Sequence, residues 1–151
     1  MVLVLAPTFY SILINDEKLT NFLPSYEFTN GDMLPAVFQN YAQRGTGFPH
    51  IVFRLQETEG NHWNKEEYRL YIDVWDFQES ATTVQAKKIA RRIKNLIHKL
   101  KINEADGYKS IRCKLRSKGL IEEDEDYIVR YELEFYVWAW DKQFVEESEN
   151  V

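Results

Sequence analysis

The sequence predicts an α+β fold, in which a mostly antiparallel sheet of about four strands packs against an N-terminal helix and one long central helix. Apolar residues recur at helical spacing near the N-terminus and again near the middle, while later segments alternate apolar and polar residues. Hairpin-length loops separate neighbouring strand segments. We expect one domain over residues 1–142 and an acidic C-terminal tail at residues 143–151 that frays.

The first helix is predicted over residues 7–19, because Pro7 suits a first helical turn and apolar residues follow at helical spacing. Proline and Asn-Gly breakers make residues 20–36 turn-rich. Residues 37–41 form a short apolar-polar alternation, which predicts a strand or an ordered loop.

Four later segments are predicted to form the sheet. Residues 50–56, 68–77, 109–116 and 127–140 each alternate, with apolar side chains at every second position. The polar stretch at residues 57–66 reads as the loop of a hairpin. The sheet should therefore bury one face, because successive side chains of a strand point to opposite sides.

The central helix is predicted over residues 83–101. Thr82 and Gln85 have the spacing of a capping box, and Asn103 or Gly107 suits the left-handed turn that would end the helix. The polar side is rich in Lys and Arg. One apolar stripe follows the other side: Ala86, Ile89, Ala90, Ile93, Leu96, Ile97 and Leu100.

The charges divide the chain into three blocks. Residues 1–78 carry a net charge of −5, residues 79–118 carry +9, and residues 119–151 carry −9. The last block contains an unbroken run of five acidic residues from Glu122 to Asp126. A basic block between two acidic ones suits a protein that docks onto copies of itself or onto a larger assembly.

No motif indicates catalysis, a metal site or a cofactor. The three histidines are not spaced as metal ligands, and Cys113 falls on the inward side of its strand, where a thiol is inert. A single cysteine fits a reducing cytoplasm. The apolar run Met1–Ala6 is too short for a signal peptide or a membrane span. We expect a non-enzymatic protein that needs no cofactor or membrane.

Two kinds of partner fit the basic block. Clustered Lys and Arg on the helix at residues 83–101 and the strand at residues 109–116 could bind phosphates. No aromatic residue is interleaved among them for base stacking, so a nucleic-acid-binding module is the runner-up. Complementary patches on one molecule favour head-to-tail association, which closes as a ring or continues as a filament.

Several residues are candidates for a subunit or tail interface. Arg112, Lys114 and Arg116 could instead face Glu132 and Glu134 across a hairpin and be neutralised within one subunit. Trp138 and Trp140 suit an interface, or they could instead pack beneath the N-terminal helix or residues 20–47. The candidates are Lys87, Lys88, Arg91, Arg92, Arg112, Lys114, Arg116, Glu122, Glu123, Asp124, Trp138 and Trp140.

Four segments together resemble the tail-completion and tail-terminator proteins of long-tailed bacteriophages and their prophage relatives. They are the Gly-Phe-Pro entry at residues 47–53, the strand Leu70–Phe77, the helix at residues 86–100 and the closing strand Tyr131–Trp138. The resemblance extends over roughly residues 7–142 and is one of pattern and order.

The resemblance implies a ring, commonly a hexamer, that caps the tail tube and provides the surface for joining the head. It implies no catalytic residues and no cofactor. The implied partners are other copies of the chain, the tail tube protein and the head–tail connector proteins. The implied location is the bacterial host cytoplasm during assembly and then the head–tail junction of the virion. Our hypothesis is that the basic block at residues 87–116 meets an acidic block of the adjacent subunit or of the tail.

Overall fold

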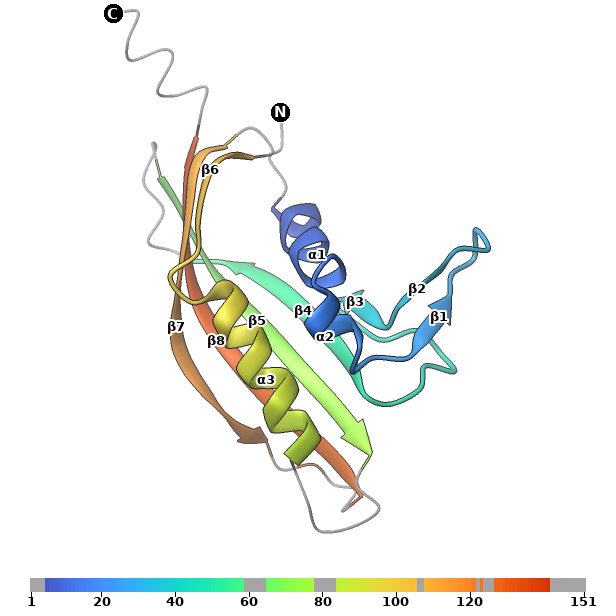
Figure 1. Ribbon diagram of the computed structural model, residues 1–151. Helices are drawn as coiled ribbons and strands as arrows, with labels where there is room; N and C mark the ends of the chain where they lie inside the picture. The colour runs from blue at the N-terminus through green and yellow to red at the C-terminus, as the bar shows by residue number, and fades with distance from the viewer. Residues whose placement is uncertain are drawn as a thin grey trace, which may run out of the picture.

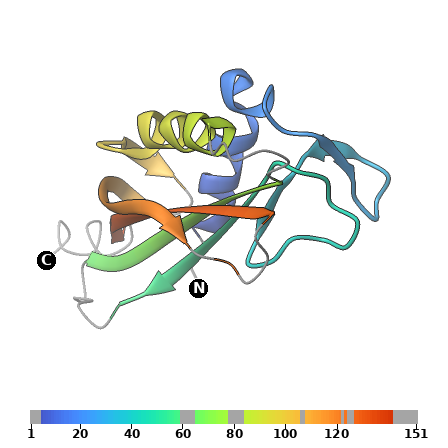
Figure 2. The ribbon, with the colours of Figure 1, turned by 90° about the horizontal axis from the view of Figure 1, so that it is seen from below.

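The computed structural model is mostly β. Strands account for 52% and helices for 23% of the described residues, so the prediction of an α+β fold with one long central helix is wrong. A curled, mixed, six-stranded sheet forms the centre, and the three helices of the described residues lie on one side of it (Figures 1 and 2). The described part of the chain comprises residues 5–58, 65–77, 84–105, 108–121, 123 and 127–141.

The sheet has the strand order β3-β4-β5-β8-β7-β6. Its long central strands are confirmed close to the predicted positions. Strands β5 and β7 extend beyond the predicted segments because flanking residues also find cross-strand partners, whereas β8 is shifted by one residue. Only β3 and β4 pair in parallel among the described strands. The strands are β3 (Val37–Gln39), β4 (His50–Glu57), β5 (Lys65–Phe77), β6 (Lys101–Ala105), β7 (Tyr108–Ile121) and β8 (Ile128–Asp141).

The central helix is shorter than expected. Helix α3 spans Val84–Ile97, whereas the sequence predicted a helix over residues 83–101. Lys99 adopts a left-handed conformation with φ 64°, and the chain then enters β6, which pairs with β7. Residues from Lys101 onward therefore pair with the backbone of β7, and the helix does not continue for a further turn. Lys99, rather than Asn103, holds the left-handed turn; Thr82 and Gly107 lie outside the described residues.

The N-terminal helix is divided in two. Helix α1 spans Ala6–Ile14 and helix α2 spans Glu17–Thr20. The break has a local cause, because the Asp16 side chain accepts a hydrogen bond from the Leu19 amide at 2.9 Å and so caps α2.

The turn-rich segment forms a small hairpin of its own. Strands β1 (Ser25–Glu27) and β2 (Met33–Pro35) pair as a separate two-stranded sheet. Gly31 lies in their connection with φ 90°, a conformation that glycine adopts without strain. Figure 1 shows this hairpin projecting beside α2.

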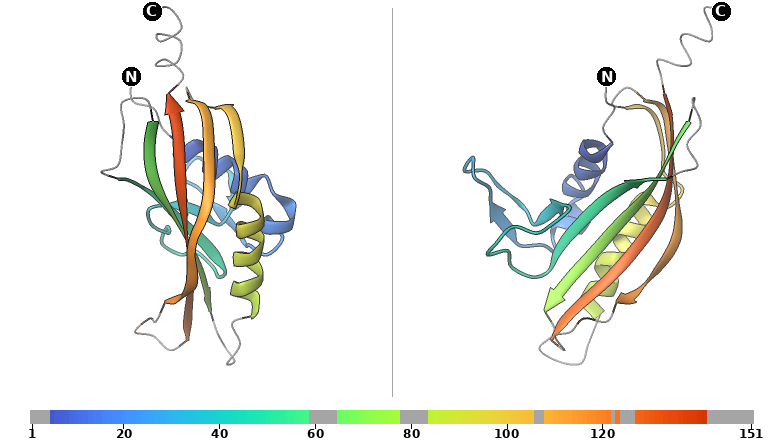
Figure 3. Two further views of the ribbon diagram at one scale, coloured as in Figure 1. Left: turned by 90° about the vertical axis from the view of Figure 1, so that its left-hand side faces the viewer. Right: turned by 180° about the vertical axis from the view of Figure 1, so that it is seen from behind.

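The core lies between the helices and one face of the sheet. The expected alternation is confirmed, because Leu70, Ile72 and Val74 of β5 are fully buried. The apolar stripe of α3 enters the same core. The opposite face of the sheet is not covered by any described helix, as the view from that side shows (Figure 3). The core residues of α3 are Ala86, Ile89, Ala90, Ile93 and Ile97.

Candidate assembly surfaces

The uncovered face of the sheet carries alternating charged and aromatic side chains. Tyr71 of β5 lies between Arg54 of β4 and Glu134 of β8, and Arg69 lies opposite Tyr136. The Arg54 guanidinium carbon is 3.9 Å from the centre of the Tyr71 ring, and that of Arg69 is 4.2 Å from the Tyr136 ring centre. These cation–π contacts fix the arginine side chains against the sheet.

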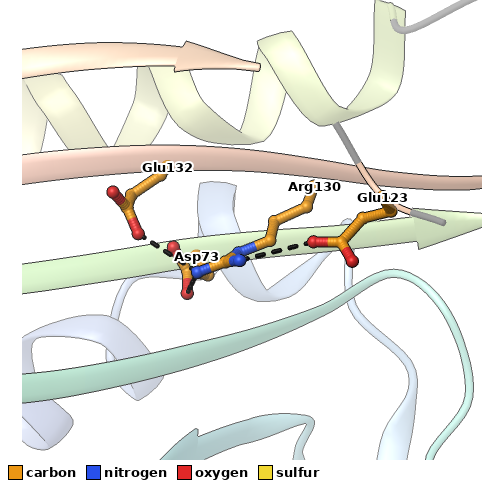
Figure 4. A network of polar contacts seen from close by, with 4 residues as sticks. All are labelled: Asp73, Glu123, Arg130 and Glu132. Atoms are coloured by element: carbon orange, nitrogen blue, oxygen red, sulfur yellow. Dashed lines mark hydrogen bonds and ion pairs between the residues drawn. The ribbon is translucent and has the colours of Figure 1, made fainter. Parts of the chain in front are cut away.

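Arg130 is the centre of an ionic network on this face (Figure 4). Its guanidinium nitrogens lie 3.0 Å from Asp73, 3.2 Å from Glu132 and 3.3 Å from Glu123. The carbon of the guanidinium is 5.1 Å from the centre of the Trp75 ring. Asp73 is 7% exposed, so Arg130 compensates a carboxylate that has lost most of its water.

Burial and neighbours shift the pKa values of two glutamates in opposite directions. Burial, reinforced by hydrogen bonding to Asp73, raises the pKa of Glu132. Burial also acts to raise the pKa of Glu134, but hydrogen bonds from Arg116, Tyr71 and Ser117 outweigh it, so the pKa of Glu134 is lowered. On this face, Glu132 therefore loses its proton less readily than an ordinary glutamate, and Glu134 loses its proton more readily.

The predicted charge pairing between β7 and β8 is confirmed for one arginine. Arg116 donates a hydrogen bond to Glu134. Lys114 lies opposite Tyr136 and Arg112 opposite Trp138, so the expected pairing of these two cations with glutamates is wrong. The register of β7 on β8 shifts between Leu115 and Ser117, which a sequence pattern does not reveal.

Both candidate tryptophans of β8 lie on the uncovered face. Trp138 stacks on Tyr136, with ring centres 5.5 Å apart and planes 14° from parallel. Trp138 pairs with Glu67 and Arg112, and Trp140 pairs with Lys65 and Ser110. Each is half-buried. The alternative that they pack beneath the N-terminal helix is therefore wrong.

The basic residues of α3 fall into two groups. Arg92 donates hydrogen bonds to both carboxylate oxygens of Asp16, at 2.8 and 2.6 Å, and so ties α3 to the start of α2. This pairing lowers the pKa of Asp16. Lys87, Lys88 and Arg91 are exposed, and none of them forms an ion pair with a described residue.

A basic cavity of about 460 Å³ lies between α3 and the β7–β8 part of the sheet. Lys87 and Arg91, two of the candidate interface residues, line it. Lys94 and Lys118 also line it and were not among those candidates. The spacing of the three helix cations (i, i+4 and i+7) places them on one side of α3. Its lining is Lys87, Ala90, Arg91, Lys94, Asn95, Lys118 and Tyr131.

The acidic candidates are described in part. Glu123 pairs with Arg130 and so faces its own chain. Glu122 and Asp124 lie outside the described residues, as does the tail at residues 143–151.

Cys113 and His98 belong to residue types that often take part in catalysis, and here both make contacts within the fold. Cys113 is buried, and burial raises the pKa of its thiol to about 12. The Nδ1 atom of His98 accepts a hydrogen bond from the Leu115 amide at 2.9 Å. Among the described residues no cluster of three or more acidic, His or Cys side chains is placed to hold a metal ion. No helix in this part of the chain has the length and apolar character of a membrane span.

The fold has a counterpart in a solved structure. It is similar to a chain in the virion of a native gene transfer agent particle, with a TM-score of 0.65 and 13% sequence identity. The similarity covers 87% of this chain and 90% of the other. At this identity it shows a shared fold. No family model and no curated protein matches the sequence.

Proposed function

We propose that this protein is a non-catalytic structural component of a phage-like particle. The observation that carries the proposal is the shared fold with a virion chain, since the similarity extends over nearly the full length of both. Within such a particle, we assign it to the end of the tail tube. There, a ring of copies would stop tube growth and present the surface that joins the head.

The two surfaces support a role in assembly. The uncovered face offers a broad sheet with half-buried Tyr136, Trp138 and Trp140, and aromatic side chains of this kind anchor protein interfaces. The cavity beside α3 supplies cations that are unpaired within the described chain. A ring needs two different faces that complement each other between neighbours. The proposed partners are further copies, the tail tube protein and the head–tail connector proteins.

The proposal is tested by mixing the purified protein with purified tail tubes that lack their terminal protein. Negative-stain images should show a ring at one end of each tube, and light scattering should detect an oligomer alone or with tubes. Tubes that stay bare while the protein remains monomeric would contradict the proposal. A strongly salt-dependent shift of DNA or RNA by the protein, without capping, would favour the nucleic-acid-binding alternative.

A further inference from the structure

The basic cavity gathers four cations around one hollow. Lys87, Arg91 and Lys94 approach it from α3, and Lys118 approaches it from β7. No carboxylate from the described residues lines it, and none of the four cations forms an ion pair with a described residue. Like charges held close together repel one another. The arrangement therefore favours an anionic occupant that offsets this repulsion.

We propose that this cavity binds the C-terminal segment, residues 142–151, of a second copy of the chain. This inference rests on the proposed ring and names one of its contacts. The segment contains Glu146, Glu147 and Glu149 and a single cation, Lys142. Asn95 and Tyr131 add hydrogen-bonding groups to the lining. The carboxylates of the segment thus match the charge and the polar character of the cavity.

The reach of the chain favours a second copy over the same copy. Lys118 pairs with Leu133, which lies eight residues before the end of β8 at Asp141, or ~27 Å at ~3.4 Å per residue. Glu146 follows that end by five residues, which span at most ~18 Å when fully extended. A chain that turned back on itself would end ~9 Å short of the level of Leu133 at Glu146, so its own cavity is a poorer site for all three glutamates. A neighbour stacked head-to-tail has no such restriction.

The shape of the cavity favours carboxylates over a nucleic-acid backbone. Backbone binding uses cations spread along a track, with aromatic platforms for the bases. Here the cations converge on one hollow, and Tyr131 is the one aromatic residue that the described part of the chain contributes to its lining. A short peptide with clustered glutamates fits this convergence better.

The test measures binding of a fluorescently labelled peptide of residues 142–151 to the full chain by anisotropy. Arg91→Glu and Lys118→Glu should each weaken binding about tenfold or more, and raising the salt should weaken binding to the unchanged protein. Lys88→Glu is the matched control, because Lys88 is exposed on the same helix and does not line the cavity; it should change affinity less than about twofold. Circular dichroism would verify that each variant is folded.

Three results would overturn the inference. They are no peptide binding at low salt, equal weakening by Lys88→Glu and the two cavity variants, and undiminished binding of a peptide in which the three glutamates are glutamines. Preferential binding of a short DNA duplex at the same residues would also overturn it and would assign the cavity to nucleic acid.

A second measurement separates this inference from the proposed function. The full chain carrying Glu146→Gln, Glu147→Gln and Glu149→Gln should form a smaller or weaker oligomer than the unchanged protein in light scattering. If this variant still caps tubes normally and the peptide does not bind, the inference fails and the ring remains. If the peptide binds as expected but no tube is capped, the cavity assignment holds and the proposed function fails.

Discussion

The uncovered face of the sheet and the basic cavity carry similar side chains but balance their charges differently. On the face, Arg130 and Arg116 are paired with carboxylates of the same chain. In the cavity, Arg91 and Lys118 have no such partner among the described residues. Charges paired within a chain contribute to its folding, whereas unpaired charges are available to a partner. The net charge of a segment therefore does not distinguish these two roles. They are distinguished by whether each charged side chain has a partner within its own chain.

The largest effect on stability is expected at the centre of the paired face. Arg130→Ala would remove the ion-pair partner of the buried Asp73 and of its neighbour Glu132, so the free energy of unfolding should fall by about 2–3 kcal/mol. Urea denaturation measures this loss. Arg112→Ala is the control, because Arg112 is exposed on the same face and should change stability by less than about 0.5 kcal/mol. Equal stability of the two variants would mean that the network does not support the fold.

Glu134 should show a stabilising charge that depends on pH. Its folded pKa is lowered below the ordinary 4.5, so ionised Glu134 adds stability above that pH, and this is lost as the pH falls through the folded value. Glu134→Gln should therefore lower the free energy of unfolding at pH 7 by about 1.5 kcal/mol. The difference should shrink steadily in acid. A difference that is independent of pH would show that shape, and not charge, explains the loss.

Glu132 should behave in the opposite way. Its folded pKa is raised, so its contribution to stability is present in acid and is lost as the pH rises through the folded value. Glu132→Gln should match the unchanged protein in acid and gain up to about 1 kcal/mol at neutral pH, because an amide can donate to Asp73 without adding a charge. Thermal unfolding across a pH series measures this gain. A loss of stability at neutral pH would mean that the pairing of Glu132 with Arg130 dominates.

The smallest effect on stability is expected in the basic cavity. Arg91→Ala should change the free energy of unfolding by less than about 0.5 kcal/mol, because Arg91 is exposed and has no described ion-pair partner. Its neighbour Arg92 provides the contrast, since Arg92→Ala removes the hydrogen bonds to Asp16 and should lower the urea midpoint. A larger loss for Arg91→Ala than for Arg92→Ala would reverse the distinction between the two groups of cations.

Much of the sheet could be predicted from the sequence. Strands β5 and β8 have long apolar-polar alternation, and their burial depends mainly on this period. Strand β6 could not be found in the same way, because Lys101 read as the end of the central helix and the residues after it as the turn that ends it. The break at Asp16 did have a local signal, since an aspartate followed by a short helical stretch is a common N-cap.

The candidate surfaces were less predictable than the strands. The helix cations Lys87 and Arg91 were recognisable from composition, but the cavity also depends on Lys118, which the fold brings to the same place from β7. The partners of Arg112 and Lys114 depend on a register shift in β7. Positions that follow from a repeating pattern are thus accessible to sequence reasoning, whereas positions that follow from packing between distant segments are not.

The placement of the tryptophans gives the molecule its own optical reporter. Trp75, Trp138 and Trp140 belong to the uncovered face of the sheet, whereas no tryptophan of the described residues lines the basic cavity; the fourth tryptophan, Trp63, lies outside the described residues. The fluorescence of these three tryptophans should therefore shift when another molecule covers that face and stay nearly constant when a ligand enters the cavity. The order in which the two surfaces engage during assembly could then be followed in real time without attaching a dye.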